Sequence, residues 1–360
     1  MRATVTAIEF ADAMKKVSGI CKKSPIPVLN QVCVEFFGNT CRLTATDLAV
    51  WLSAEITACG NAFTFCFGNV AAVTRACQYY SGVLELELLD DGENKRVCMR
   101  CEDKESVFPV FSADLFPVRP NEDAAETYEA NAKELLSRVK SIQYAANICD
   151  DRQGLNGVCF EKDRLWCIDG YRLAISRSDA LQIKTPFVLP VPAMQYLRLL
   201  GDSACSLKVG SRYVTVSSEN LSISIRRVEN FIRISVEKAV PSTFAEEYQI
   251  NVSQFQQAVT YLLECAAGMD RPYAVFDYGR IILHRKDSEH SAKLDVQGDC
   301  DCQYGFDLRY MKDALRQFEK ETSVTVSIGD EYTPILLSGS GSNTALIVPI
   351  RMKNEWRRAA

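Results

Sequence analysis

The sequence predicts an α+β protein of three similar domains, each with two helices packed on antiparallel sheets. Three observations lead to this prediction. A short pattern recurs about one domain length apart, an amphipathic helix opens each domain, and most of the remaining chain alternates apolar and polar residues.

The recurring pattern reads LNQVCVE over residues 29–35 and LNGVCFE over residues 155–161. Each copy leads through a strand-like stretch to an aspartate, Asp47 or Asp169, and apolar alternation follows. The copies lie much farther apart than the units of a solenoid, which span about 20–45 residues. The repeat is therefore a whole domain.

Each domain opens with a helix whose apolar residues recur at helical spacing. The three stripes are Phe10, Ala13, Met14, Val17, Ile20 and Cys21; Leu135, Leu136, Val139, Ile142 and Ala146; and Phe255, Ala258, Val259, Leu262, Leu263 and Ala266. A second helix is predicted near residues 68–80, 192–201 and 307–320. Asn131 with Glu134 fits a capping box, Pro192 a first helical turn, and Asp307 an N-cap.

Alternating residues, as in 207–225 and 324–328, predict strands with one dry face that helices can cover. Proline and charge interrupt the pattern near residues 117–123 and 240–247. We therefore predict domains over residues 1–120, 124–243 and 245–352, followed by a tail over residues 353–360.

Composition indicates an ordinary globular protein, with 47% hydrophobic and 24% charged residues. No apolar run approaches the roughly 20 residues that span a bilayer, and the first residues do not resemble a signal peptide. We expect a cytoplasmic protein with no membrane partner. Fifteen cysteines, an odd number, then favour a reduced compartment over a disulfide framework.

The cysteine pairs Cys98 with Cys101 and Cys300 with Cys302 raise the question of a metal site. Both pairs lie in strand-like stretches, and His284 and His290 are the only histidines of the chain. Small buried hydrophobic side chains are the better interpretation. We expect no metal and no other cofactor.

Several segments together resemble the bacterial DNA polymerase III beta subunit, or sliding clamp, family over essentially the whole chain. Residues 155–158 (LNGV) followed by 169–174 (DGYRLA) are similar to its second-domain motif. Residues 305–310 (GFDLRY) resemble the start of a third-domain helix, and residues 348–352 (VPIRM) resemble the terminal stretch. The order and spacing of these motifs make the resemblance more specific than any one of them.

The resemblance implies a non-enzymatic processivity factor for DNA replication. Two protomers would join head to tail, domain one against the partner's domain three, into a homodimeric ring around duplex DNA. Sheets would form the outside of the ring and helices would line the hole. A DNA polymerase catalytic subunit, a clamp loader and other proteins with a clamp-binding motif would be its protein partners.

A sliding ring needs sequence-independent attraction to phosphate, so basic residues are expected on the helices that line the hole. The net charge of −5 is not in conflict with this, because DNA binding depends on where the basic residues lie and not on the sum of charges. Each of these side chains taken singly also fits a solvated helix face. The predicted DNA-facing residues are Lys15, Lys16, Lys22, Lys23, Lys133, Arg138, Lys140, Arg152, Arg198, Lys312 and Arg316.

The resemblance also implies a groove that takes a short partner peptide with apolar anchors. For Leu155, Leu173 and Ile350, ordinary core packing is the competing interpretation. The groove residues carried over are Leu155, Ile168, Gly170, Tyr171, Arg172, Leu173, Arg233, Ile234, Asp307, Tyr310, Val348, Pro349, Ile350, Arg351 and Met352.

The chain departs from the family's pattern in four places. Tyr171 stands where histidine is common, and residues 153–154 stand where some relatives have aromatic residues beside DNA. Ala266 and Ala267 align near a bulky interface patch, which puts the strength of the dimer in doubt. The tail beyond Met352 brings Trp356 near the groove, where it could cover part of it.

Two other classes of function remain open. A metal-dependent nuclease would need clustered carboxylates, but Asp47 and Asp169 lie in separate repeats and fit turn formation at a strand end. There is also no GxxxxGK or GxSxG motif. A repeat-built scaffold that binds proteins but not DNA is compatible with the net charge.

Overall fold

A computed structural model describes residues 1–22, 24–90, 92, 94–119, 122–147, 155–231, 234–298, 303–330 and 332–352. The chain forms two compact units. Unit 1 contains residues 1–134 and 195–227, and unit 2 contains residues 135–194 and 228–360.

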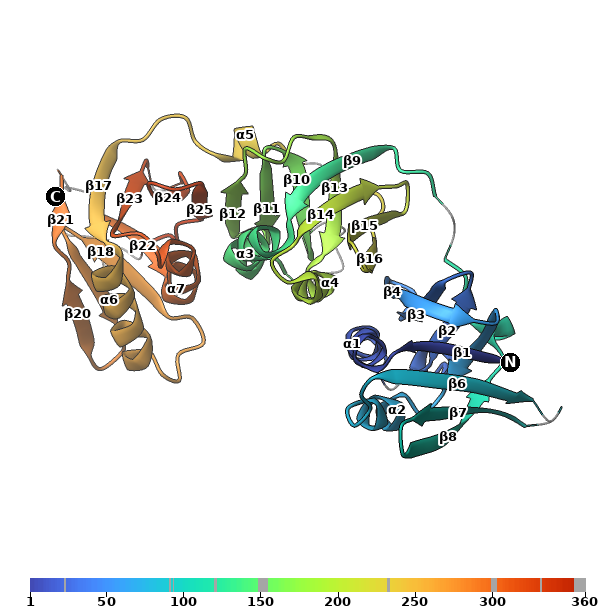
Figure 1. Cartoon of the computed structure of the whole chain (residues 1–360). Coiled ribbons are helices and arrows are strands. Elements are labelled where there is room, and N and C mark those ends of the chain that lie inside the picture. Colours follow the sequence, from blue (N-terminus) through green and yellow to red (C-terminus); the bar gives the residue numbers. More distant parts are fainter. Residues whose placement is uncertain are drawn as a thin grey trace. The chain divides into compact units, whose positions relative to one another are not determined.

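One order of elements, βαββββαβββ, recurs along the chain (Figure 1). The first run is β1 (Arg2–Thr6), α1 (Ala7–Ser18), β2 (Val32–Phe37), β3 (Thr40–Thr46), β4 (Val50–Gly60), β5 (Phe63–Phe67), α2 (Val70–Cys77), β6 (Val83–Asp90), β7 (Lys95–Cys101) and β8 (Lys104–Phe111). The second run is β9 (Glu126–Asn131), α3 (Ala132–Ile142), β10 (Gly157–Lys162), β11 (Arg164–Ile168), β12 (Arg172–Arg177), β13 (Ile183–Pro190), α4 (Val191–Met194), β14 (Ala204–Val209), β15 (Tyr213–Ser218) and β16 (Leu221–Arg226).

The third run is β17 (Glu246–Asn251), α6 (Val252–Cys265), β18 (Tyr273–Asp277), β19 (Arg280–His284), β20 (Glu289–Lys293), β22 (Gln303–Asp307), α7 (Leu308–Leu315), β23 (Ser323–Ile328), β24 (Ile335–Ser338) and β25 (Asn343–Ile347). It also contains the short strand β21 (Val296–Gln297). Between these elements lie α5 (Val236–Ala239) and the 3₁₀ turns η1 (Pro27–Asn30), η2 (Ala113–Leu115), η3 (Gln143–Ala145), η4 (Gln195–Leu200) and η5 (Arg316–Phe318).

The strands of the described residues form three antiparallel sheets. In unit 1 the order is β1-β6-β7-β8-β5-β2-β3-β4-β16-β15-β14-β9, and β1 also pairs with β4. In unit 2 one sheet has the order β13-β10-β11-β12-β25-β24-β23-β17-β21, and the other β20-β19-β18-β22. The α+β prediction with antiparallel sheets is confirmed.

Two of these pairings join one run to the next. β4 pairs with β16, with Val50 opposite Ile225, and β12 pairs with β25, with Arg172 opposite Ile347. The second predicted domain therefore contributes strands to both compact units. The three-domain boundaries stay a prediction. One sheet combines strands of the first and second predicted domains, and another combines strands of the second and third.

The predicted helix stripes are the buried faces of the opening helices. Phe10, Met14 and Val17 of α1 are fully buried, as are Phe255 and Leu262 of α6. α1 packs beside α2 and against β3 and β4, and α6 packs beside α7 (Figure 1). Helix spacing in the sequence thus identified which residues enter the core.

Asn131 and Asp307 both act as N-caps, as predicted; of the capping box at Asn131, the bond to the Glu134 N–H is seen. The Asn131 Oδ1 atom accepts the Glu134 N–H at 3.0 Å, and the Asp307 Oδ1 atom accepts the Arg309 N–H at 2.8 Å. The helix predicted over 192–201 is shorter than expected: α4 continues as the 3₁₀ segment η4 up to Leu200. Gly201 follows with a φ of 67°, a left-handed conformation that ends the helical stretch.

The cysteines of the described chain are mostly buried side chains of strands. Cys98 and Cys101, the predicted pair on β7, are both buried, as small hydrophobic residues would be. Cys300 and Cys302 lie outside the described residues. Within the part of the chain that the structure describes, no helix is both long and apolar enough to cross a bilayer.

Candidate functional site

The turn between β11 and β12 places the centre of the candidate site. The Asp169 Oδ1 atom accepts the backbone N–H groups of Tyr171 at 2.9 Å and Arg172 at 2.8 Å. Gly170 has a φ of 92°, which a residue with a Cβ rarely adopts. Asp47 forms the equivalent turn before β4, accepting from Ala49 and Val50. The turn interpretation of both aspartates is confirmed.

Arg172 is the most connected side chain of the site. Its guanidinium donates to Asp169 at 2.9 Å, to Asp313 at 2.9 Å and to the Tyr144 carbonyl at 2.8 Å. It also lies 4.4 Å from the ring centroid of Tyr310 and 5.5 Å from that of Tyr144. Its side chain is only 11% exposed, so these contacts replace solvent around a cation.

Two aromatic rings extend this cluster to the surface. The ring of Tyr171 stacks on that of Tyr310, with centroids 6.2 Å apart and planes 29° apart. Desolvation raises the pKa of the Tyr310 phenol, which keeps it neutral. Tyr171 is 60% exposed, and its carbonyl accepts the Val348 N–H at 2.9 Å.

The chain after β25 completes an exposed apolar area. Val348 is 44% exposed, and Pro349 and Ile350 are half-buried. The Ile350 N–H donates to the Gly305 carbonyl at 2.9 Å, which holds this segment against β22. We call the area formed by Tyr171, Tyr310, Val348, Pro349 and Ile350 the Tyr171–Val348 surface; all five residues belong to unit 2.

The other predicted groove residues take different positions. Leu155 and Leu173 are buried, and Ile168 and Ile234 pack against the same apolar cluster as Leu173. Asp307 is buried and engaged in its helix cap and in an ion pair with Arg309. Arg351 is exposed over the ring of Tyr332, and Met352 is half-buried. Arg233 and the tail with Trp356 lie outside the described residues.

Sequence reasoning missed three residues of this region. Tyr144 and Asp313 hold Arg172, and Tyr332 lies under Arg351 at 5.7 Å from its ring centroid. Arg172 is 28 residues from Tyr144 and 141 from Asp313 along the chain, so no local spacing indicates either contact.

The predicted DNA-facing side chains are partly engaged with neighbours. Lys16 pairs with Asp12 at 2.7 Å, Lys133 with Asp202 at 2.7 Å, and Arg316 with Asp313 at 3.7 Å. Arg138 donates to the Arg177 carbonyl and the Ser342 hydroxyl. Lys23 and Arg152 lie outside the described residues.

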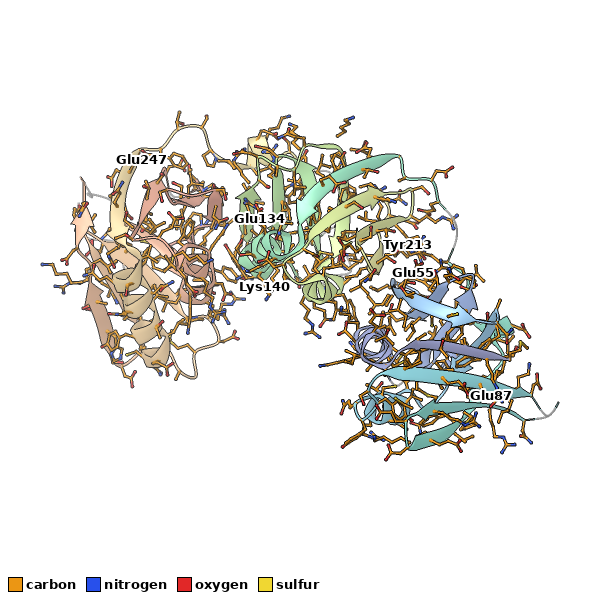
Figure 2. The ribbon with its side chains drawn as sticks, in the orientation of Figure 1. Glu55, Glu87, Glu134, Lys140, Tyr213 and Glu247 are labelled. Carbon is orange, nitrogen blue, oxygen red and sulfur yellow. The ribbon has the colours of Figure 1, made fainter. Side chains whose placement is uncertain are left out.

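The remaining cations are more available. Lys15 and Lys140 are exposed on α1 and α3, and Figure 2 shows Lys140 projecting from α3. Lys22 follows α1, Arg198 lies on η4 and Lys312 on α7. No ion pair with another described residue is seen for these five side chains. α6 carries no lysine or arginine.

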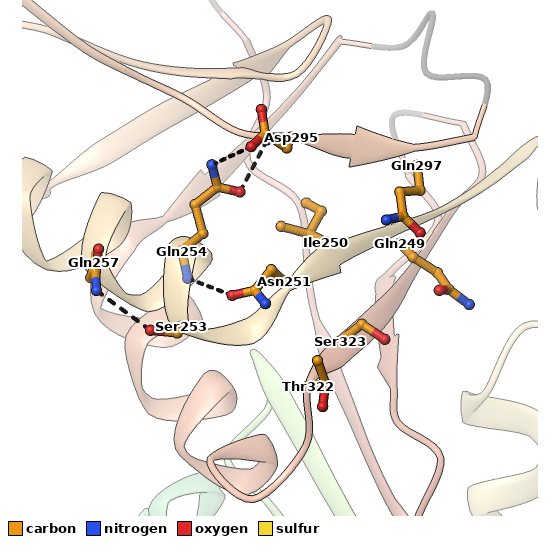
Figure 3. Close-up of a pocket in the computed structure, with 10 residues that line it drawn as sticks. All are labelled: Gln249, Ile250, Asn251, Ser253, Gln254, Gln257, Asp295, Gln297, Thr322 and Ser323. Carbon is orange, nitrogen blue, oxygen red and sulfur yellow. Dashed lines mark hydrogen bonds between the residues drawn. The ribbon is translucent and has the colours of Figure 1, made fainter.

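A hollow in unit 2 lies away from both sets of residues. It has a volume of about 660 Å³ and is lined by amides and hydroxyls from β17, α6 and β23 (Figure 3). Gln254 bonds to Asp295 and Asn251, so much of its lining is already paired. It holds none of the predicted site residues.

The described residues contain no cluster of three or more metal-ligating side chains. Both turn aspartates already accept two backbone N–H groups, and Asp169 also pairs with Arg172. The site consists of an exposed apolar area supported by a buried cation.

The chain is similar to known proteins over nearly its whole length. No protein-family model matches the chain. The beta sliding clamp of Vibrio cholerae is 22% identical over 376 residues, covering 98% of this chain and 100% of that protein. The beta sliding clamp of Buchnera aphidicola is 22% identical over 243 residues, covering 64% of this chain and 65% of that protein.

Solved structures agree with these relatives. The DNA polymerase III subunit beta of Pseudomonas aeruginosa superimposes with a TM-score of 0.87 at 16% identity, covering 98% of this chain and 100% of that one. That of Streptococcus pyogenes gives a TM-score of 0.87 at 14% identity, with the same coverage.

The chain is thus an α+β protein of recurring βαββββαβββ runs joined through continuous antiparallel sheets. This is the fold of the DNA polymerase III beta subunit, and the chain is similar over nearly its whole length to beta sliding clamps.

Proposed function

We propose that two copies of this chain close into a ring around duplex DNA and act as a processivity clamp for a DNA polymerase. The observation that supports this proposal most strongly is that the same kind of strand pairing joins each run of the fold to the next. The strand after the Asp47 turn pairs with β16 of the next run, and the strand after the Asp169 turn pairs with β25 of the next.

In the third run the equivalent strand is β20, which among the described strands pairs with β19 alone. β20 follows the β19 turn and is an edge strand of its sheet. β8 is the last strand of the first run, just as β16 and β25 are the last strands of theirs. One side of β8 pairs with β7, and the other pairs with β5 only at Val110 and Phe111. Pairing β20 of one copy with β8 of another would repeat the internal joint between copies. Two such joints close a head-to-tail dimer.

The proposed DNA contacts are non-specific. Lys15, Lys140, Arg198 and Lys312 sit on helices or helical turns and present charge without an ion partner among the described residues. Phosphate contacts of this kind release counterions and read no base edges. A clamp needs that combination, since it must hold the duplex and still move along it.

The Tyr171–Val348 surface is proposed to bind partner peptides, including those of the polymerase and the clamp loader. Its exposed ring and aliphatic side chains offer contact area for apolar anchors. Arg172 fixes the ring of Tyr310 from below, so the surface is preformed and little ordering is required on binding. We propose that the chain has no catalytic site of its own. We also propose that it acts in DNA replication in the cytoplasm.

The protein-only scaffold and the nuclease remain the alternative functions. Retention on nicked circular DNA after loading, with loss on linearisation, is expected of a ring and not of a scaffold. Cleavage of DNA that requires a divalent metal would favour the nuclease. Light scattering at micromolar concentration should give about twice the chain mass of 40.2 kDa; a monomer would contradict the ring.

The peptide surface has its own test. Tyr171→Ala should weaken binding of a short labelled peptide with apolar anchors by tenfold or more. Tyr278→Ala changes another exposed tyrosine of unit 2, in the β18–β19 turn, and should leave the affinity unchanged. If both variants lose affinity for the peptide equally, or if neither loses affinity, the assignment of the surface is refuted.

A further inference from the structure

Two cysteines of unit 1 stand directly opposite each other in neighbouring strands. Cys33 of β2 is the register partner of Cys66 of β5 in an antiparallel pair. In the strand registers of the described residues, no other cysteine has a cysteine directly opposite it. This pair therefore differs from the other buried thiols of the chain.

Directly opposite residues of an antiparallel pair have Cα atoms about 4.5–5.5 Å apart. A disulfide needs a Cα separation of roughly 4.4–6.8 Å. The backbone of β2 and β5 thus already meets the distance requirement. We propose that Cys33 and Cys66 are a reversible redox pair that a peroxide oxidises to a disulfide between β2 and β5.

The two thiols differ in access and in chemistry. Cys33 is half-buried, whereas Cys66 is buried beside Trp51 and Phe116. The side-chain interaction with Cys66 lowers the pKa of Cys33, whereas the interaction with Cys33 and burial raise the pKa of Cys66. Cys33 is thus the nucleophile, because it is both the more accessible thiol and the one whose thiolate is stabilised.

The reaction balances with one equivalent of hydrogen peroxide. The Cys33 thiolate attacks one peroxide oxygen, the O–O bond breaks, and the leaving hydroxide takes up a proton to become water. The resulting Cys33 sulfenic acid is attacked by the Cys66 sulfur, which forms the S–S bond and expels a second water. Two thiols are oxidised and one peroxide is reduced; a dithiol reductant reverses the change.

The disulfide would add a covalent link at a junction of the unit 1 sheet. Cys66 faces Cys33 on one side and Phe111 of β8 on the other. The β5–β8 pairing is short, with Cys66 opposite Phe111 and Phe67 opposite Val110. Oxidation holds β5 to β2 and should raise the Tm of unit 1. This inference depends on the fold of unit 1 and not on the proposed clamp function.

Peptide mapping tests the pair directly. Trypsin cleaves after residues 23, 42 and 75, so Cys33 falls in peptide 24–42 with Cys41, and Cys66 falls in peptide 43–75 with Cys59. The C59S variant removes the exposed thiol from the second peptide and serves as the background. After treatment with hydrogen peroxide, the two peptides should be joined, and dithiothreitol should separate them.

The C33S change in the C59S background should abolish the linked peptide, while C41S should leave it. Tryptophan fluorescence, to which Trp51 beside Cys66 contributes, should fall on oxidation and recover on reduction in the C59S protein, and stay constant after C33S. The proposal is overturned if peroxide yields only sulfinic or sulfonic acid at Cys33, or if the linked peptide survives C33S. C33S concerns a half-buried residue, so the variant is expected to fold, and circular dichroism checks this.

Discussion

The guanidinium of Arg172 lies 4.4 Å from the ring centroid of Tyr310, between β12 and α7. The same group pairs with Asp169 and Asp313, each at 2.9 Å. One buried cation therefore orders the turn before β12, the helix α7 and the ring that supports Tyr171. The apolar surface and its electrostatic support are parts of one arrangement.

Arg172→Ala should destabilise unit 2 by about 3 kcal/mol, because it leaves the Asp169 carboxylate, 8% exposed, without its cation. Urea unfolding followed by circular dichroism measures the change. The matched control is Arg177→Ala on the same strand, whose guanidinium is 51% exposed and pairs with Asp163. The control should cost no more than about 1 kcal/mol. Equal losses in the two variants would contradict the central role of Arg172.

Local patterns in the sequence predicted much of the fold. Helix faces follow from 3.6-residue periodicity, and the Asn131 and Asp307 caps and the Asp47 and Asp169 turns involve residues two or three positions apart. Such contacts depend on little beyond their own segment, so reading residue types in order is enough to find them.

Contacts between distant segments could not be predicted in this way. The β4–β16 and β12–β25 joints, and with them the division into two units, depend on register between strands far apart in the chain. For the candidate site, Leu173 and Tyr171 are two residues apart in one motif, yet the first is buried and the second 60% exposed. The family motif contains both residues, but it does not show that Leu173 lies in the core and Tyr171 on the exposed surface.

A proline in β20 should separate the proposed dimer. The Arg285 N–H donates to the Ser288 carbonyl, so bonds to β19 alternate from that point and the Ser291 N–H points away from β19. Ser291→Pro removes a donor that faces away from β19 and that a further strand would use, and should raise the dimer Kd by tenfold or more. Analytical ultracentrifugation measures this Kd.

Ser291→Ala is the control for that variant, because it removes the hydroxyl and keeps the N–H. It should dimerise like the unaltered protein. A Ser291→Pro protein that remains folded and dimerises as tightly would exclude β20 from the interface.

Lys15→Ala should weaken binding to duplex DNA and reduce its salt dependence. If Lys15 contacts a phosphate, its loss lowers the slope of log K against log salt by about 0.9. Fluorescence anisotropy at several salt concentrations gives the slope. Lys95→Ala changes a lysine paired with Asp90 at 3.2 Å, away from the helices, and should leave the slope unaltered. An unchanged slope for Lys15→Ala would remove α1 from the proposed DNA contacts.

Glu237 makes the stability of unit 2 depend on acid pH. Hydrogen bonds from Lys162, its own backbone N–H and Arg164 lower the pKa of this carboxyl from 4.5 to about 2. A carboxyl with a lowered pKa stabilises the folded state fully above its unfolded pKa, and that contribution is lost as the pH falls from about 4.5 toward 2. Since Glu237 lies on α5 and Arg164 on β11, the interaction ties the segment after β16 to the β10–β11 hairpin.

Glu237→Gln should therefore lower the Tm at pH 7 and narrow the difference in Tm between pH 7 and pH 3. The effect should be modest, because the Glu237 side chain is 49% exposed and solvent screens the pair. Glu319→Gln alters an exposed carboxyl in unit 2 and should leave both values nearly unchanged. If Glu237→Gln keeps the full loss of Tm between pH 7 and pH 3, other carboxyls carry the acid sensitivity and the α5 contact contributes little to folding.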